Sequence, residues 1–265
     1  MILNRLKLAI DICKVTSNWP TVFLNYFGLI NKNFIVFEFK DGSQIIIERG
    51  NKEGETSGFA TIWEILIKKM YNPRGFKIKD KDTVIDIGAN MGIFSIYAAK
   101  RAKRGKVYSF EPFLPHYTRL KNNIGLNKLN NIITYNLAVS NKGGISQFFI
   151  SNISSGMHSL YKLEKTKQRS ICVQKISFNK FILKNKIQKI DFLKIDCEGS
   201  EYDILYSLSK SNLRKINKIS LEFEELNNKK NNSDYLKKFL NKAGFKVYVN
   251  KINNKEKIKR MYAYK

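Results

Sequence analysis

The stretch VIDIGANMGIFSIYAA, residues 84–99, indicates the fold of this chain. Its apolar start predicts a buried strand, and the chain then turns through Gly88 and Gly92 into an apolar helix. Glycine permits a sharp turn and lets a ligand approach the backbone closely. The start of a helix adds unpaired N–H donors and the positive end of the helix dipole. The stretch therefore predicts a nucleotide-type ligand site at the end of a strand.

The spacing of the glycines separates this loop from two other nucleotide-binding loops. Asn90 stands where the G-x-G-x-x-G loop of dinucleotide enzymes has its second glycine, and the two glycines are four positions apart. No Lys-Ser/Thr pair follows, as the phosphate-gripping G-x-x-x-x-G-K-[ST] loop requires. We therefore expect a ligand without a phosphate at this loop.

The next predicted strand, residues 106–112, ends in Phe110-Glu111-Pro112. Glu111 follows Gly92 at nearly the spacing at which an acidic residue on the neighbouring strand meets the hydroxyls of a ribose. A carboxylate can accept hydrogen bonds from both hydroxyls and repels a 2′-phosphate. We expect Glu111 to bind an adenosyl ribose.

Outward from this stretch, strands and helices alternate, which predicts a parallel sheet covered on both faces. Ligands of such folds bind outside the carboxyl ends of the strands. The predicted strands are residues 82–88, 106–112, 132–139, 143–151, 169–178, 190–196, 218–224, 245–249 and 259–265. The predicted helices are residues 93–103, 114–127, a segment from Ser200, and 233–244. Before this stretch, we expect one or two short helices within residues 1–30 and a helix over residues 59–70. Residues 33–49 hold two strand-like runs around Asp41-Gly42, the dipeptide that a tight hairpin turn prefers.

A second polar motif, LKIDCEGSEYDIL at residues 193–205, follows a buried strand. Three carboxylates within six residues are costly to bury unless they serve a function. Asp196 ends the strand at the expected ligand edge, and Ser200 is expected to cap the following helix with Glu201 in its first turn. Glu222 and Glu224 lie two apart on the next strand and therefore share one face.

Together these motifs resemble the FkbM family of S-adenosylmethionine-dependent methyltransferases. The similarity covers residues 82–206 through DIGANMG, SFEP, NLAVSNKGG, SSGMHSL and KIDCEGSEYDIL. KIDCEGSE is the most specific of these motifs, since DIGANMG alone points only to the broader class I methyltransferase fold. The resemblance implies an α/β, Rossmann-like fold: a seven-stranded, mostly parallel sheet with a reversed last strand. We expect a helix and hairpin extension over residues 1–58 and the methyltransferase domain over residues 59–265.

The resemblance also implies roles for individual residues toward the cofactor S-adenosyl-L-methionine. Glu111 would bind the ribose, Ala138 would lie near the adenine, and Asp196 would face the methyl group. The residues expected around the methionine part are Asp86, Gly88, Asn90 and Gly92. Cys197 stands where the family usually has a small apolar residue, which fits a buried thiol better than a catalytic one.

The reaction we expect is O-methylation, in which a hydroxyl of a glycan or secondary metabolite attacks the sulfonium methyl. Most of the rate would come from placing the reactants at near-attack distance and angle. A hydroxyl is a poor nucleophile, so a general base is needed. Asp196 is the expected base, with Glu198 or His158 as alternatives.

Two other functions stay open at this stage. A nucleic-acid methyltransferase would use the net charge of +26, but the Asn/Asp-Pro-Pro-aromatic motif of base-amine methylation is absent from the sequence. A cofactor-binding protein without catalysis is the other alternative. The 9 Arg are few against 39 Lys, whereas phosphate and base recognition favour Arg. Because the lysines are spread along the chain, we expect no nucleic-acid partner and attribute the charge to AT-rich codon usage.

The overall composition and the cysteine content exclude several classes of protein. With 43% apolar and 26% charged residues, the chain has globular composition. No run of about 18 uncharged apolar residues predicts a membrane span, and charged residues interrupt the first 15 positions, unlike a signal peptide. The three cysteines, Cys13, Cys172 and Cys197, have no metal-binding spacing. We expect a cytoplasmic enzyme with no metal site.

Overall fold

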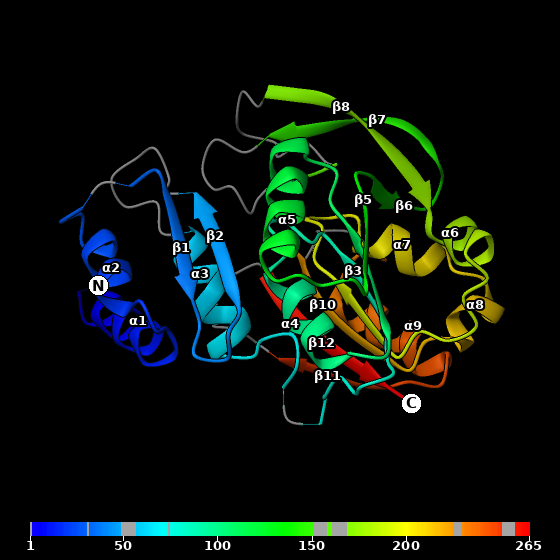
Figure 1. Cartoon of the computed structure of the whole chain (residues 1–265). Helices are drawn as coiled ribbons and strands as arrows, with labels where there is room; N and C mark the ends of the chain where they lie inside the picture. The colour runs from blue at the N-terminus through cyan, green and yellow to red at the C-terminus, as the bar shows by residue number, and fades with distance from the viewer. Residues whose placement is uncertain are drawn as a thin grey trace.

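The computed structural model describes residues 2–30, 32–48, 57–73, 75–150, 158–160, 169–224, 229–250 and 258–265. Its centre is a seven-stranded sheet in the order β11-β12-β10-β9-β3-β4-β5 (Figure 1). The strands are β3 (Thr83–Ile87), β4 (Lys106–Phe110), β5 (Ile132–Tyr135), β9 (Phe192–Ile195), β10 (Lys218–Glu224), β11 (Lys246–Asn250) and β12 (Ile258–Tyr264). This is the class I methyltransferase arrangement, so the predicted fold is confirmed.

The reversed last strand lies inside the sheet rather than at its edge. β12 pairs antiparallel with β10 on one side, where Lys218 faces Tyr264, and with β11 on the other. The pairs β3–β4, β4–β5, β3–β9 and β9–β10 are all parallel. The carboxyl ends of the parallel strands therefore meet along one edge, which is where chemistry is expected.

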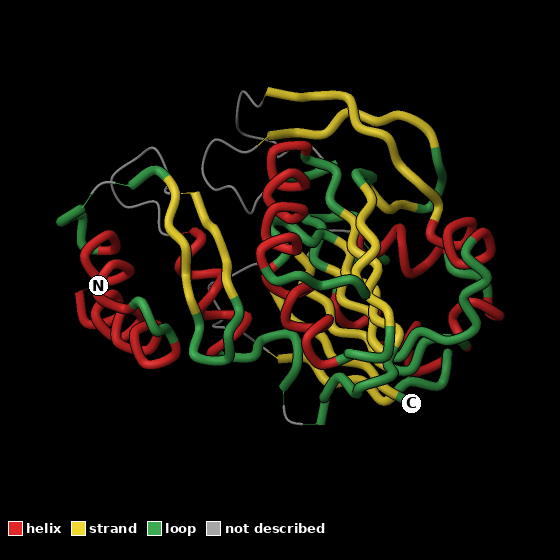
Figure 2. Tube along the Cα trace, viewed as in Figure 1, coloured by secondary structure: helices red, strands yellow, loops and turns green. Residues whose placement is uncertain are grey.

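Helices cover both faces of this sheet (Figure 2). They are α4 (Ile93–Arg101), α5 (Leu114–Leu126), α6 (Phe178–Lys184), α7 (Glu201–Ser207), α8 (Lys210–Arg214) and α9 (Ser233–Lys242). The sequence predicted α4, α5, α7 and α9. It missed α6 and α8, which are single or double turns too short to show a periodic apolar pattern. In α8 the Ser209 hydroxyl accepts a hydrogen bond from the Asn212 N–H and caps the helix.

The strand predicted over residues 132–139 is divided in two, which corrects the prediction. After β5, the Asn136 side chain donates hydrogen bonds to the carbonyls of Glu111 and Pro112, both at 2.9 Å, and so ends the pairing with β4. The chain then continues as β6 (Ala138–Ser140) in a separate sheet with β7 (Gly144–Ile150) and β8 (Arg169–Ser177). This smaller sheet rises beside α5 in Figure 1.

The N-terminal segment forms α1 (Ile2–Val15), α2 (Trp19–Tyr26) and a hairpin of β1 (Phe34–Glu38) and β2 (Gln44–Glu48). This confirms the predicted helices and the turn at Asp41-Gly42. The helix predicted over residues 59–70 is present as α3 (Ser57–Ile62), which continues as a π-helix, η1 (Trp63–Ile67), and ends three residues earlier than predicted. The Lys68 N–H there donates to the Trp63 carbonyl at 2.8 Å, a five-residue step that widens the helix.

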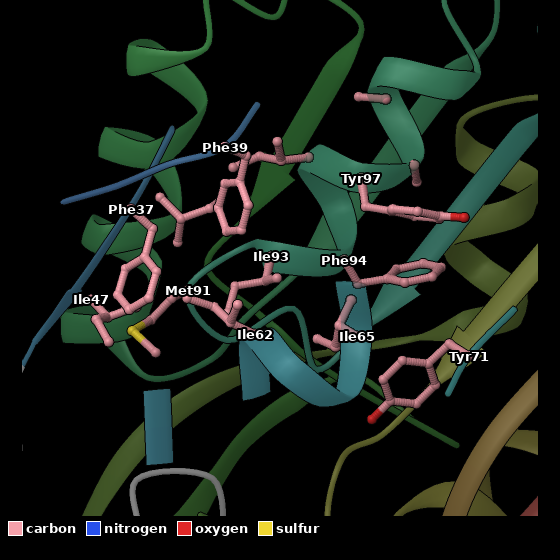
Figure 3. Close-up of a cluster of buried hydrophobic side chains, with 14 of the residues drawn as sticks. Phe37, Phe39, Ile47, Ile62, Ile65, Tyr71, Met91, Ile93, Phe94 and Tyr97 are labelled. Atoms are coloured by element: carbon pink, nitrogen blue, oxygen red, sulfur yellow. The ribbon is translucent and has the colours of Figure 1, made fainter. Parts of the chain in front are cut away.

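The hairpin packs against α5 and shares a buried cluster with α3 and α4. Phe37 and Ile47 belong to the same buried cluster as Ile62 and Phe94 (Figure 3). The Asn123 side chain, from α5, also accepts from the Ile46 N–H at 2.7 Å and donates to the Ile46 carbonyl at 3.1 Å. That amide satisfies the open edge of the hairpin, as a neighbouring strand would. The domain boundary at residue 58 stays a prediction.

Candidate active site

A cavity of about 290 Å³ opens at the carboxyl ends of β3, β4, β9 and β10. Its lining contains Glu111 from the end of β4, Asp196 from the end of β9 and Glu222 from β10. The helical segment α3–η1 closes it from the N-terminal side. The structure thus brings together, around one space, residues that are more than 100 positions apart in the sequence.

The glycine-rich loop forms one wall, and its shape depends on two glycines. Gly88 has φ +77°, and a Cβ there would lie 1.7 Å from the carbonyl oxygen of Asp196, so no other residue fits. Gly92 has φ +86° and begins α4, where a Cβ would lie 2.3 Å from a methyl carbon of Leu120. Gly88 lines the cavity, whereas Gly92 supports the loop from behind.

Asn90 and Glu111 link the loop to the end of β4. The Asn90 N–H donates to one oxygen of Glu111 at 2.8 Å, and the Phe113 N–H donates to the other at 2.9 Å. Burial raises the pKa of Glu111 to about 7, although these two hydrogen bonds oppose the rise. The Asn90 side-chain oxygen is buried without a hydrogen-bond partner. Ala138 lies on the same side of the cavity as Glu111 and Pro112.

Asp86 lies beneath the loop and does not line the cavity. Its carboxylate is fully buried, 3.1 Å from the Lys194 ammonium, and accepts a hydrogen bond of 2.6 Å from the Ser95 hydroxyl. Lys194 in turn donates to the Gly88 carbonyl at 2.7 Å. Asp86 therefore holds the loop through Lys194, instead of reaching into the cavity as the resemblance implied.

Asp196 is held at the cavity edge by two side chains. One oxygen, Oδ2, accepts a hydrogen bond of 2.7 Å from the Tyr71 hydroxyl and lies 3.5 Å from the Lys194 ammonium. The side chain is 27% exposed, so part of it faces the cavity. Tyr71 was not predicted, and no local signal points to it, because it precedes Asp196 by 125 residues. Lys194 was not predicted either, although the sequence indicates it, because a lysine inside a buried apolar strand needs an oppositely charged partner.

Glu198 and Glu201 follow in the same motif, where Glu201 is buried and Glu198 half-buried. The Glu201 carboxylate accepts from the N–H groups of Cys197 and Gly199 at 3.0 and 2.8 Å, and burial raises its pKa to about 8. Burial, together with the charges of Asp196 and Glu224, raises the pKa of Glu198 as well. A carboxyl that keeps its proton near neutral pH is a poor general base. The burial that raises the pKa of the Cys197 thiol fits the expected structural role of that residue.

The predicted cap at Ser200 is wrong. Its side chain makes no capping hydrogen bond, although Glu201 does lie in the first turn of α7. The Ser200 hydroxyl is buried without a partner in the lining of the cavity.

His158 lies in the cavity wall on the Glu111 side. Its ring stacks on His116 with centroids 5.2 Å apart and contacts the edge of Phe113 at 4.7 Å. Burial lowers the pKa of both histidines, that of His116 to about 3. The neighbouring Ser159 hydroxyl donates to the Glu198 carbonyl, so this segment fastens the smaller sheet to the KIDCEGSE motif. The rest of the predicted SSGMHSL loop, residues 154–157, lies outside the described residues.

Three features define a class I methyltransferase. The sheet is mostly parallel, with the reversed strand β12 between β10 and β11. A glycine-rich loop follows β3, and an acidic residue follows β4. The chain belongs to the methyltransferase FkbM domain family, which matches residues 86–247, more than half of its length. It is an S-adenosyl-L-methionine-dependent methyltransferase, which confirms the predicted enzyme class and cofactor.

Among curated relatives, AMB antimetabolite synthetase AmbE of Pseudomonas aeruginosa is 26% identical over 227 residues. That match covers 70% of this chain but 10% of AmbE, so the chain spans about a tenth of that relative. Methyltransferase 1 of Beauveria bassiana is 22% identical over 204 residues, covering 70% of this chain and 80% of that protein.

Among solved structures, a fibrillarin pre-rRNA processing protein of Methanococcus jannaschii has a TM-score of 0.48 at 13% identity, covering 89% of this chain and 95% of that chain. Fibrillarin of Aeropyrum pernix, solved with S-adenosyl-L-methionine, has a TM-score of 0.45 at 13% identity, covering 88% and 94%. In the described part of the chain, no helix is both long enough and apolar enough to cross a membrane.

Glu111 gives a test of the cofactor site. We expect Glu111→Ala to weaken S-adenosylhomocysteine binding by about 10- to 150-fold, since hydrogen bonds to a charged group contribute about 1.5–3 kcal/mol. Ribose hydroxyls stabilise the ionised carboxylate, so affinity of the wild type should fall as pH drops below about 7. Calorimetry from pH 6 to 8 measures both effects.

The matched variant Glu111→Gln keeps the shape of the side chain but cannot ionise. Its affinity should therefore lose the pH dependence attributed to Glu111. Equal pH profiles in the wild type and Glu111→Gln, or unchanged affinity in Glu111→Ala, would show that Glu111 does not bind the ribose.

Proposed function

We propose that this enzyme transfers a methyl group to a hydroxyl oxygen of a secondary metabolite or glycan. The observation that carries the proposal is Asp196, a partly exposed carboxylate at the carboxyl end of β9 whose orientation is set by Tyr71 and Lys194. Both contacts involve the same carboxylate oxygen, Oδ2. The other oxygen is the one we assign to the acceptor hydroxyl.

The residues around the cavity fit S-adenosylmethionine. We assign Glu111 to the ribose, Ala138 to the adenine, and the loop of Gly88 and Asn90 to the methionine part. The Asn90 side-chain oxygen, a buried polar atom without a hydrogen-bond partner, belongs to a residue of the cavity lining and favours a polar ligand there. The start of α4 adds N–H donors suited to a carboxylate.

When bound, this cofactor supplies a methyl group whose bond to sulfur breaks as its bond to the acceptor oxygen forms. Asp196 orients the acceptor hydroxyl and takes its proton. Tyr71 and Lys194 keep the carboxylate in place, so that it is already oriented when the acceptor binds. The products are the methyl ether and S-adenosylhomocysteine, and Asp196 regains its charge when it passes the proton to water.

The acceptor class rests on the relatives. AmbE is named as an antimetabolite synthetase, and other matches are fungal methyltransferases, including methyltransferase sdnD of Sordaria araneosa, 23% identical over 168 residues. The first name supports a small biosynthetic product as acceptor. A glycan hydroxyl stays the alternative acceptor within the same reaction class.

The experiment is transfer of an isotope-labelled methyl group from S-adenosylmethionine to a panel of hydroxylated metabolites and oligosaccharides. Mass spectrometry of the products locates the label. We expect it in a methyl ether on oxygen, with one S-adenosylhomocysteine formed for each methyl transferred. Label on nitrogen or carbon, or transfer to RNA and DNA in preference to these acceptors, would overturn the proposal.

A further inference from the structure

The side of the cavity nearest the N-terminal segment is built by α3 and η1, which precede the family match at residues 86–247. Ala60, Thr61, Glu64 and Ile65 line the cavity from these two helices. Glu64 lies in the π-helical turn, a feature often found at functional sites. This wall therefore lies outside the residues that the family match covers.

All charged residues of the cavity lining except Lys194 are acidic, although the whole chain carries a net charge of +26. Its lining contains four carboxylates at this end: Glu64, Asp196, Glu198 and Glu222. Because 48 Lys and Arg stand against 22 Asp and Glu in the sequence, an average set of residues from this chain would be basic. These acidic residues lie where we expect the acceptor to bind.

Two cations, Lys194 and Arg260, lie among these acidic residues, and the charge of Glu64 also acts on Arg260 by raising its pKa. Lys194 contacts the buried Asp86 at 3.1 Å and donates to the Gly88 carbonyl. The Arg260 guanidinium binds Glu222 at 2.7 Å. In the described residues, no three His, Cys, Asp or Glu side chains group closely enough to hold a metal ion. Because Lys194 is shared between Asp86 and Asp196, the two cations offset less charge than the carboxylates around them carry, and this excess of negative charge favours an organic cation.

The proton affinities of the carboxylates agree with this excess of negative charge. Burial and the charge of Asp196 raise the pKa of Glu222 to about 7, against the opposing effect of Arg260, and Glu64 adds to the rise. Burial and the same Asp196 charge raise the pKa of Glu198. A positive group placed among these residues would lower the cost of ionising them.

Ser200 provides an independent indication of a ligand. It is 1% exposed, its hydroxyl has no hydrogen-bond partner, and it lines the cavity two residues after Glu198. A buried hydroxyl without a partner costs free energy until a ligand satisfies it. An ammonium group has three donors and no acceptor, so it can satisfy carboxylates and a hydroxyl oxygen together.

We infer that the acceptor is an amino alcohol, whose protonated amine is recognised by Glu64, Glu222 and Ser200 while its hydroxyl faces Asp196. The inference rests on the proposed function, because it takes this cavity as the acceptor site. The sulfonium of S-adenosylmethionine supplies one positive charge, and Glu64, Asp196 and Glu222 leave negative charge for a second, whereas Glu198 keeps its proton.

The test is calorimetry on the full chain saturated with S-adenosylhomocysteine, using D-glucosamine and D-glucose as a matched pair of probes. We expect the amine to bind at least about tenfold more tightly than the neutral sugar at pH 7, the ratio expected for one charge-assisted contact. Glu64→Gln should remove most of that preference. Ser200→Ala, a smaller change that threatens folding less, should reduce it about threefold.

The matched control is Asp234→Asn, which removes one negative charge from an exposed position in the first turn of α9. It should keep the full preference. Equal binding of the two sugars by the wild type, or equal loss of preference in Asp234→Asn and Glu64→Gln, would overturn the inference.

A further comparison separates the acceptor amine from the sulfonium. If the carboxylates serve the sulfonium alone, Glu64→Gln weakens S-adenosylmethionine binding but not S-adenosylhomocysteine binding, and the inference fails. If they serve the acceptor, the ratio of the two cofactor affinities is unchanged. The methyl-labelling experiment tests transfer to oxygen separately, so failure of the proposed function is distinguishable from failure of amine recognition.

Discussion

Replacing Asp196 with asparagine is expected to lower methyl-transfer turnover by about 10²- to 10⁴-fold, the usual contribution of a general base. The amide keeps the shape of the side chain but cannot take the acceptor proton. S-adenosylmethionine affinity should stay within about threefold of the wild type, because Glu111 and the glycine-rich loop hold the cofactor in our assignment. Turnover with the labelled cofactor and calorimetric affinity measure the two quantities.

Glu198→Gln and His158→Ala are the comparison variants, since either residue was an alternative base. We expect smaller losses from both. Burial and neighbouring charges raise the pKa of Glu198, and the His158 ring is stacked on His116 at the Glu111 side of the cavity. Near-normal turnover in Asp196→Asn, with a large loss in one of these variants, would move the base to that residue.

A loss of cofactor affinity in Asp196→Asn would have a different meaning. It would show that Asp196 holds the ligand rather than the proton. Tyr71→Phe refines the assignment, because it removes the hydrogen bond that orients Asp196 without removing the carboxylate. A positioning role predicts lower turnover with unchanged cofactor affinity in that variant.

Much of the fold was predictable because its signals are local. The apolar strand before Gly88 and the glycines at positions whose φ is positive determine the turn into α4 without distant contacts. Asp41-Gly42 likewise marks the hairpin through its own backbone preference. The carboxylates Glu111, Asp196 and Glu198 were found in the cavity lining because parallel strands bring their carboxyl ends to one edge.

The rest depended on contacts between distant segments. The Asn136 amide ends β5 by binding two carbonyls of the preceding strand end, and no propensity of residues 132–139 reveals this. Tyr71 reaches Asp196 from a segment outside the recognised motifs. The π-helical turn that places Glu64 in the cavity wall looks, in sequence, like an ordinary amphipathic helix. Tyr71 and Glu64 belong to the side of the cavity that we assign to the acceptor. The residues assigned to the cofactor were therefore easier to predict from the sequence than those assigned to the acceptor.

Loss of the Lys194 side chain should strongly reduce stability. It is 3% exposed, and its ammonium lies 3.1 Å from the fully buried Asp86 carboxylate and donates to the Gly88 carbonyl at 2.7 Å. Asp86 and Lys194 belong to adjacent strands, β3 and β9, in direct register. We expect Lys194→Met to lower the free energy of unfolding by about 3–5 kcal/mol, because it leaves a buried carboxylate without its cation.

Urea unfolding followed by circular dichroism measures this loss, with Lys106→Met as the control because that lysine is exposed at the start of β4. The control should change stability by about 0.5 kcal/mol or less. The double variant Asp86→Asn/Lys194→Met tests the mechanism, even if Lys194→Met alone does not fold. It should be more stable than Lys194→Met, because removing both charges avoids the unpaired one. A double variant no more stable than Lys194→Met would mean that lost packing, rather than the stranded charge of Asp86, causes the instability.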